Sequence, residues 1–310
     1  MTPRQILFFL VASVLTSFVA SCGAGGAGEG NVSIVRVSRQ NNSGTYVYFR
    51  EAVLGKNREY RLGTIDQSGS KDVVALVENT PNAIGYSGMA YATPSVKMLK
   101  VSLKKGGPGV APTLETAQSG SYPIARPLFL YTNGEPKGAV KDYIDWIMSG
   151  EGQAIVQEIG YVPVGSTTGT VADAAPAKAS HSEASFKVKG SDTMVNLSQA
   201  WAQNYSEKRP NVTAQVSGGG SGVGIAGLID GTVDIATASR KMKDSELALA
   251  TQKNGIEPKE FIVGRDALAV YVHKDNPLDE ISIEELAEIY GEGGKTEQWT
   301  QINPNWSLKK

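Results

Sequence analysis

One junction of a strand, three glycines and a helix constrains this chain more than any other stretch. Residues 212–216 alternate apolar and polar side chains, as in a strand, and the glycines 218–220 follow. Apolar residues then recur at helical spacing through Ile229. Such a junction leaves the first backbone N–H groups of the helix without intrahelical partners, and we expect Ser221 to cap it. Because the helix dipole adds partial positive charge there, the junction predicts a site for a small oxyanion.

A second junction of this kind lies near the start of the chain. Residues 34–37 predict a short strand, a polar loop follows, and a helical pattern begins at Tyr46. Ser43 is placed to be the N-cap of this helix, and the Thr45 hydroxyl can turn toward the same point. Arg39 adds a forked donor that suits a tetrahedral oxyanion. The alternative for this arginine is a solvated surface side chain.

A third junction follows the strand predicted at residues 186–190, where Ser191, Asp192 and Thr193 begin a helix. A capping box at residues 282–285 begins another helix. The alternation of strands and helices favours an α/β architecture. Further strands are predicted at residues 83–86, 127–131, 233–239, 261–263 and 267–272, further helices at residues 71–78, 139–148 and 151–159, and irregular structure at residues 101–118.

The first 22 residues predict an export signal. Arg4 precedes an apolar run over residues 6–20, which is too short to favour a permanent membrane span. The run ends in Ala-Ser-Cys, similar to a bacterial lipobox, whose cysteine becomes the lipidated first residue. Ordinary signal cleavage near Ser21 is the alternative. We expect Cys22 to hold the protein at a membrane surface, in the periplasm or another extracytoplasmic space, through a flexible tether at residues 23–30.

Composition and motifs exclude several classes of protein. The formal net charge of −1 over 310 residues argues against a nucleic-acid partner, because phosphate backbones require a basic surface. The glycine pattern at residues 222–227 matches a dinucleotide fingerprint but lacks the acidic residue about 20 positions later. The two histidines and the single cysteine stand in unrelated contexts, so we expect neither a metal nor a cofactor.

Several linked motifs resemble the substrate-binding protein of the bacterial phosphate ABC importer. The resemblance covers nearly everything outside the signal peptide and the linkers. It implies an α/β, two-lobed, periplasmic-binding-protein-like fold of type II whose lobes close over phosphate about a hinge. It also implies delivery of phosphate to a membrane permease by a monomer that is not an enzyme. The motifs are Lys-Gly-Ser-Asp-Thr-Met at residues 189–194, Ser-Gly-Gly-Gly-Ser-Gly at 217–222, Asp-Ile-Ala-Thr-Ala-Ser-Arg at 234–240, residues 38–46, and the closing segments 146–153 and 160–163.

The order of these motifs departs from the family pattern, in which the Gly-Ser-Asp-Thr-Met segment comes first. The chain therefore resembles a circular permutant whose linker, residues 165–184, joins the family's old termini. Within the resemblance, lobe A covers residues 124–265 and contains that linker. Lobe B combines residues 31–123 and 266–310. The hinge is expected at residues 124–127 and 265–267.

Carried over residue by residue, the resemblance places phosphate ligands in both lobes. Lobe A is expected to supply Thr193, the backbone amide of Met194, Ser221 and Ser239, and lobe B is expected to supply Arg39, Ser43, the backbone amide of Gly44 and Thr45.

Two departures bear on specificity. Some members have an aspartate where Ser239 stands, which accepts a bond from protonated phosphate and repels sulfate. Our hypothesis is that Asp192 supplies this missing carboxylate. Asn41 stands where some members have an acid that pairs the binding arginine, which predicts that Arg39 is freer in charge.

Two other functions stay open. A receptor for another oxyanion, such as sulfate or molybdate, shares the expected fold. An enzyme acting on phosphoesters needs a metal cluster or an activated nucleophile, and the sequence shows no motif for either.

Overall fold

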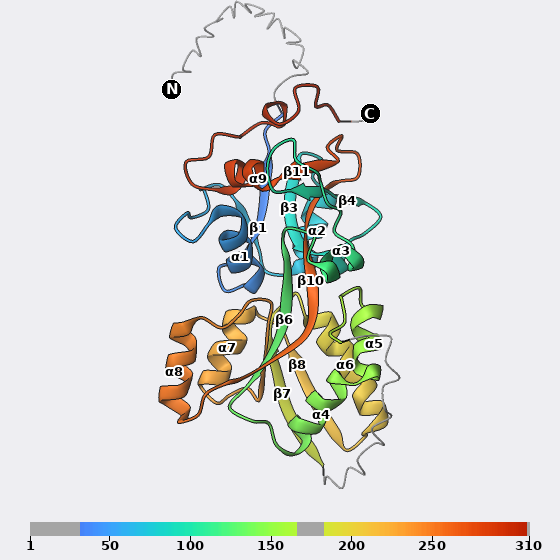
Figure 1. The fold of residues 1–310 in the computed structure, drawn as a ribbon, viewed down its shortest axis with the longest axis vertical. Coiled ribbons are helices and arrows are strands. Elements are labelled where there is room, and N and C mark those ends of the chain that lie inside the picture. The colour runs from blue at the N-terminus through green and yellow to red at the C-terminus, as the bar shows by residue number, and fades with distance from the viewer. Residues whose placement is uncertain (1–31, 166–182, 309–310) are drawn as a thin grey trace, which may run out of the picture.

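Two long strands, β6 (Ala125–Thr132) and β10 (Lys259–His273), run between two lobes in the computed structural model (Figure 1). The structure describes residues 32–165 and 183–308. The predicted signal peptide at residues 1–22, the tether at residues 23–30 and most of the linker at residues 165–184 lie outside these residues. None of the helices in the described ranges is long and apolar enough to cross a membrane.

One nine-stranded sheet continues through both lobes in the order β2-β1-β3-β10-β6-β9-β7-β8, and β4 also pairs with β10. The lobe strands run parallel to one another, β1 beside β2 and β3, and β7 beside β8 and β9. The antiparallel partner of β10 changes from β6 at Ala267 to β3 at Leu268, so the lobes join there. The strands are β1 (Val35–Arg39), β2 (Ile65–Gln67), β3 (Ala83–Gly88), β4 (Val96–Met98), β7 (Ala184–Gly190), β8 (Val212–Ser217) and β9 (Ile235–Ala238), with β5 (Lys100–Ser102) and β11 (Glu280–Ser282) paired separately.

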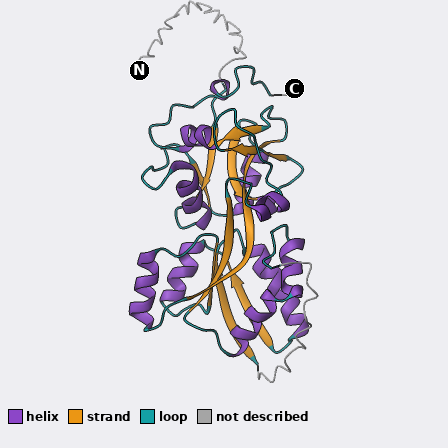
Figure 2. Ribbon diagram, in the orientation of Figure 1, coloured by secondary structure: helices purple, strands orange, loops and turns teal. Residues whose placement is uncertain are grey.

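Helices flank the strands of each lobe on both sides (Figure 2). The upper lobe of the view corresponds to the predicted lobe B, and the lower lobe corresponds to the predicted lobe A. The upper lobe contains α1 (Gly44–Phe49), its continuation as a π-helix (Arg50–Leu54), α2 (Ser70–Glu78), α3 (Leu114–Ser119), α9 (Ile283–Tyr290) and two short 3-10 turns (Met89–Tyr91 and Trp299–Gln301). The lower lobe contains α4 (Gly138–Met148), α5 (Gly150–Glu158), α6 (Val195–Lys208), α7 (Ser221–Ile229) and α8 (Asp244–Asn254).

The hydrophobic cores follow the two lobes. The upper core draws its buried residues from two parts of the chain, 34–124 and 267–306, together with Val162. Its centre is an aromatic group in which Phe49 and Tyr86 stack at 3.8 Å between ring centroids. The lower lobe has two clusters, both drawn from residues 128–263. The lobe boundaries given above stay predictions.

The predicted helix starts are partly right. Ser43 caps α1, because its Oγ accepts from the Thr45 amide at 3.1 Å. The prediction that Ser221 caps α7 is wrong. The N-cap is Gly220 at a φ of 96°, a backbone conformation that favours glycine, and Ser221 is the first helical residue. Helix α6 begins at Val195, later than predicted, because residues 191–194 form a turn.

Two predictions of irregular or broken structure are also wrong. Residues 261–263 and 267–272 belong to the single strand β10, since the charged residues between them remain paired with β6 across one bulge. Residues 101–118 include part of β5 and of α3. Helix α3 is short and largely exposed, so its apolar periodicity is weak.

Candidate functional site

The three predicted junctions meet where the lobes face each other. Strand β1 ends at Arg39 and leads to α1, while β7 and β8 of the other lobe lead to α6 and α7. The parallel strands of each lobe carry these loops at their carboxyl ends, which is where open α/β sheets bind ligands. Each predicted site side chain is at most 2% exposed: Arg39, Ser43, Thr45, Thr193, Met194, Ser221 and Ser239. Gly44 is buried as well.

The contact between the lobes is tight at Gly44. A Cβ atom at this position would lie 2.3 Å from Ser221 Oγ and 2.6 Å from Ser239 Oγ. Close by, the hydroxyl oxygens of Thr45 and Thr193 are 2.8 Å apart, although they come from opposite lobes. The structure thus brings the predicted residues of both lobes together in a closed arrangement.

The loop before α1 also binds the glycine loop before α7. The Asn42 side chain donates from Nδ2 to the Gly219 carbonyl at 3.0 Å, and the Asn42 carbonyl accepts from the Gly222 amide at 2.9 Å. The Asn42 carbonyl therefore occupies one of the backbone N–H donors at the N-terminus of α7. The sequence pattern did not single out this residue.

Arg39 is completely buried, which excludes the interpretation of a solvated surface arginine. Its guanidinium donates to the carbonyls of Gln67 and Ser68, to Ser70 Oγ and to Asp192 Oδ2. The ion pair with Asp192 measures 2.8 Å and crosses between the lobes. Burial lowers the pKa of Arg39, and the neighbouring Asp192 charge opposes that shift.

Asp192 corrects the expectation drawn from Asn41. Arg39 is not left freer in charge, because Asp192 supplies a carboxylate partner from the other lobe. The second oxygen, Oδ1, accepts from the Gly219 amide at 2.7 Å, and the side chain is 18% exposed. Both oxygens of Asp192 are thus engaged, and whether it also distinguishes phosphate from sulfate stays a prediction.

The amide of Met194 is not freely offered to an anion. It donates to the Ser191 carbonyl at 3.0 Å in the turn that precedes α6. Ser221 likewise has a protein partner, since its Oγ accepts from the Ser239 amide at 3.1 Å. Both predicted groups lie at the site, but each already has a hydrogen-bond partner.

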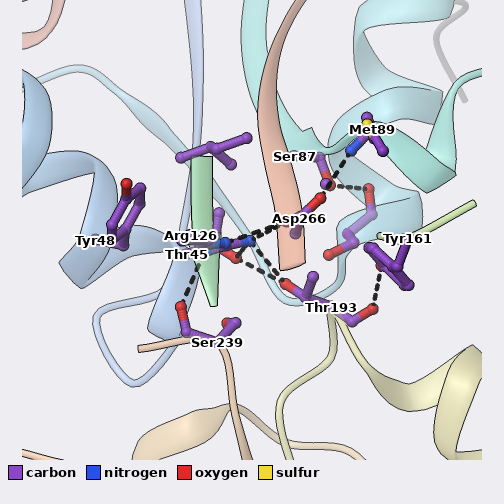
Figure 3. A network of polar contacts seen from close by, with 12 residues as sticks. Thr45, Tyr48, Ser87, Met89, Arg126, Tyr161, Thr193, Ser239 and Asp266 are labelled. Atoms are coloured by element: carbon purple, nitrogen blue, oxygen red, sulfur yellow. Dashed lines mark hydrogen bonds and ion pairs between the residues drawn. The ribbon is translucent and has the colours of Figure 1, made fainter. Parts of the chain in front are cut away.

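The sequence interpretation missed a buried ion pair between Arg126 on β6 and Asp266 on β10 (Figure 3). Arg126 Nε and Nη2 donate to Asp266 Oδ2 at 3.1 and 2.9 Å, and Nη1 donates to the Ser239 carbonyl at 3.2 Å. Nη2 also lies 3.0 Å from Thr45 Oγ1 and 3.4 Å from Thr193 Oγ1. The sequence signal that could have indicated this pair is one charged residue within each of two apolar strands, because a buried charge requires a partner of opposite charge.

Tyrosine hydroxyls fix the backbone beside Thr193. Tyr161 donates to the Thr193 carbonyl at 2.7 Å, and Tyr91 donates to the carbonyls of Asp192 and Thr193. Burial raises the pKa of Tyr91 and of Tyr161. Both phenols are therefore neutral donors at physiological pH.

Comparisons with known proteins agree with this arrangement. Residues 26–151 and 174–308 match the family model of the PBP superfamily domain. The phosphate-binding protein PstS 2 of Streptococcus agalactiae serotype V is 30% identical, over 98% of this chain and 100% of its own length. The protein of the same name from Streptococcus pneumoniae serotype 4 is 27% identical, over 94% of this chain and 97% of its own length.

A solved structure has a similar fold. The crystal structure of a phosphate-binding protein of a phosphate ABC transporter from Streptococcus pneumoniae TIGR4 superimposes with a TM-score of 0.66. The sequences are 26% identical, and the match covers 88% of this chain and 100% of that chain. The predicted two-lobed α/β fold, similar to periplasmic binding proteins, is confirmed.

The Streptococcus agalactiae relative also bears on the order of the motifs. Its alignment follows both chains in sequence order almost from end to end. That relative therefore carries the two halves in the order found here. Whether this order arose by circular permutation stays a prediction.

Proposed function

The chain belongs to the PBP superfamily and, within it, to the phosphate-binding proteins of phosphate ABC transporters, and from this membership we propose that it binds inorganic phosphate between its lobes. The observation that carries the proposal is the convergence of Arg39, Thr45, Thr193 and Ser221, from both lobes, at one buried place. The guanidinium and hydroxyl groups of these residues can donate hydrogen bonds, which the oxygens of a tetrahedral oxyanion accept.

The proposed ligands divide between the lobes. Lobe A supplies Thr193, Ser221 and Ser239, and lobe B supplies Arg39, Ser43, Thr45 and the Gly44 amide. The Met194 amide of lobe A joins them by sharing or exchanging its hydrogen bond to the Ser191 carbonyl. Each charge-assisted hydrogen bond contributes about 1.5–3 kcal/mol net. Several such bonds offset the dehydration of the anion if the loops are already in place, and the contacts among the loops support such preorganisation.

Binding is proposed to favour the closed form by contacts that exist only when the lobes meet. The hinge lies at residues 124–127 and 265–267, where β6 and β10 pair between the lobes. The closed protein then delivers phosphate to the membrane permease. It acts as a monomer, without catalysis.

A titration of the purified protein tests this function. Calorimetry with phosphate is expected to give one site, with at least tenfold weaker binding of sulfate and molybdate. Preference for sulfate or molybdate would replace phosphate as the ligand. If a chromogenic phosphoester were hydrolysed only in the presence of the protein, the protein would be an enzyme instead.

Asp192→Asn tests the source of specificity. We expect the ratio of phosphate to sulfate affinity to fall about fivefold or more, because the variant loses a carboxylate that repels fully ionised sulfate. Asp234→Asn is the matched control, since Asp234 lies in the same lobe and accepts from the Lys187 amide away from the site. An unchanged ratio in Asp192→Asn would remove Asp192 from this role.

Export and anchoring belong to the same proposal. Lipidation of Cys22 would keep the protein at the outer face of the membrane, beside its permease. Cys22→Ser is expected to move the protein from the membrane fraction to the soluble fraction in cell fractionation. Retention of Cys22→Ser in the membrane fraction would contradict the lipid anchor.

A further inference from the structure

The buried ion pair of Arg126 and Asp266 lies where the lobes join, and the proposed function gives it no role. The two residues face each other in the register of β6 and β10, next to the point where β10 changes partner. Arg126 is 1% exposed and Asp266 is fully buried. Apolar residues can often replace a buried ion pair without loss of stability, so stability alone is a weak reason for this pair.

Arg126 touches loops of both lobes at once (Figure 3). Its Nη2 atom lies within hydrogen-bond distance of the Thr45 and Thr193 hydroxyls, and its Nη1 atom donates to the Ser239 carbonyl. These three residues are proposed phosphate ligands. Asp266 holds the other edge of the guanidinium, and its Oδ1 accepts from the Met89 amide at 3.2 Å.

The threonine hydroxyls have a limited hydrogen-bonding capacity. Each has one proton to donate and two lone pairs that accept. Arg126 Nη2 has one proton left after its bond to Asp266, and the two threonine hydroxyls share it. Because this shared proton occupies an acceptor position on each hydroxyl, the hydroxyl protons must point elsewhere. One proton can join the two hydroxyls, which are 2.8 Å apart. When a phosphate oxygen lies between the loops, that proton can turn from the neighbouring hydroxyl to the anion, so that both hydroxyls donate to phosphate.

Asp266 changes what Arg126 can contribute. Its carboxylate lies 2.9 Å from Arg126 Nη2, so the pair is close to neutral as seen from the site. Burial raises the pKa of Asp266, while the charge of Arg126 and its hydrogen bonds oppose the shift. Arg126 therefore acts through the direction of its hydrogen bonds more than through net charge.

We propose that Arg126 is a positioning residue that turns the Thr45 and Thr193 hydroxyls, one from each lobe, into donors toward bound phosphate. This inference rests on the proposed function. It links phosphate binding to closure, because Arg126 contacts one hydroxyl from each lobe in the arrangement in which the lobes meet.

Arg126→Lys tests the proposal. Lysine keeps a cation beside Asp266 but lacks the planar fork that reaches several acceptors. We expect phosphate affinity, measured by calorimetry, to fall about tenfold or more. Arg50→Lys is the matched control, because Arg50 pairs with the exposed Glu59 away from the join of the lobes, and we expect its phosphate affinity to stay within about twofold of wild type.

A double-mutant cycle separates positioning from general damage. Thr45→Val is expected to weaken binding about tenfold in the wild-type background but no more than about twofold in Arg126→Lys, since the hydroxyl is then no longer directed. Wild-type affinity of Arg126→Lys, or an equal effect of Thr45→Val in both backgrounds, would overturn the proposal.

Thermal unfolding shows whether Arg126→Lys is folded. If it is not, Arg126→Met combined with Asp266→Leu removes both charges at similar volume and is expected to fold. This double variant should also lose at least about tenfold in phosphate affinity, and wild-type affinity in it would overturn the proposal. If the wild-type protein does not bind phosphate, the proposed function fails, and this inference falls with it.

Discussion

Gly44→Ala is expected to weaken phosphate binding about a hundredfold or more while leaving both lobes folded. The added Cβ would lie 2.3 Å from Ser221 Oγ and 2.6 Å from Ser239 Oγ, so the lobes could not close fully. If the hydrogen bonds from the Ser221 and Ser239 hydroxyls to phosphate are lost in this way, the binding free energy weakens by about 3–6 kcal/mol. Gly44 begins α1 without a positive φ, and alanine favours helices over glycine, so the fold itself should tolerate the change.

Calorimetry and small-angle X-ray scattering together check this result. The wild-type protein should become more compact when phosphate is added, whereas Gly44→Ala should keep the same radius of gyration. Glu51→Ala serves as a control, because Glu51 is an exposed residue of the helical turn that continues α1. Wild-type affinity and compaction in Gly44→Ala would show that closure at this contact is not needed.

Arg39→Ala is expected to weaken phosphate binding at least tenfold. The variant removes the forked donor. It also leaves Asp192, which pairs with Arg39 at 2.8 Å in the wild-type protein, as an uncompensated negative charge beside the anion. One charge-assisted hydrogen bond alone corresponds to about tenfold. The unpaired carboxylate adds repulsion to that loss.

Arg50→Ala is the control for Arg39→Ala. Arg50 lies in the same lobe and pairs with the exposed Glu59, where a surface ion pair contributes little. We expect its phosphate affinity to stay within about twofold of wild type. If Arg39→Ala bound phosphate as tightly as Arg50→Ala does, Arg39 would not be a ligand.

The parts of the site that could be predicted from the sequence are those formed by residues close together in the chain. Each junction of a strand, a polar loop and a helix is contiguous in the chain, so Ser43 could be recognised as a cap before its partner was known. The family motifs then indicated which loops belong together. Within the described residues, the structure brings the predicted side chains to one buried place.

Contacts between distant segments could not be predicted in the same way. Arg39 and Asp192 are 153 residues apart, and Arg126 and Asp266 are 140 residues apart, so no spacing rule links them. The start of α7 was misassigned for a related reason. A glycine with positive φ begins the turn, and the Ser221 hydroxyl is held by Ser239 from a neighbouring strand end.

A crystal structure of the protein with phosphate tests the central claim most directly. We predict one phosphate between the lobes, within hydrogen-bond distance of Arg39 and Thr45 on one side and of Thr193 and Ser221 on the other. Phosphate bound to one lobe only, or at a different surface, would contradict the account.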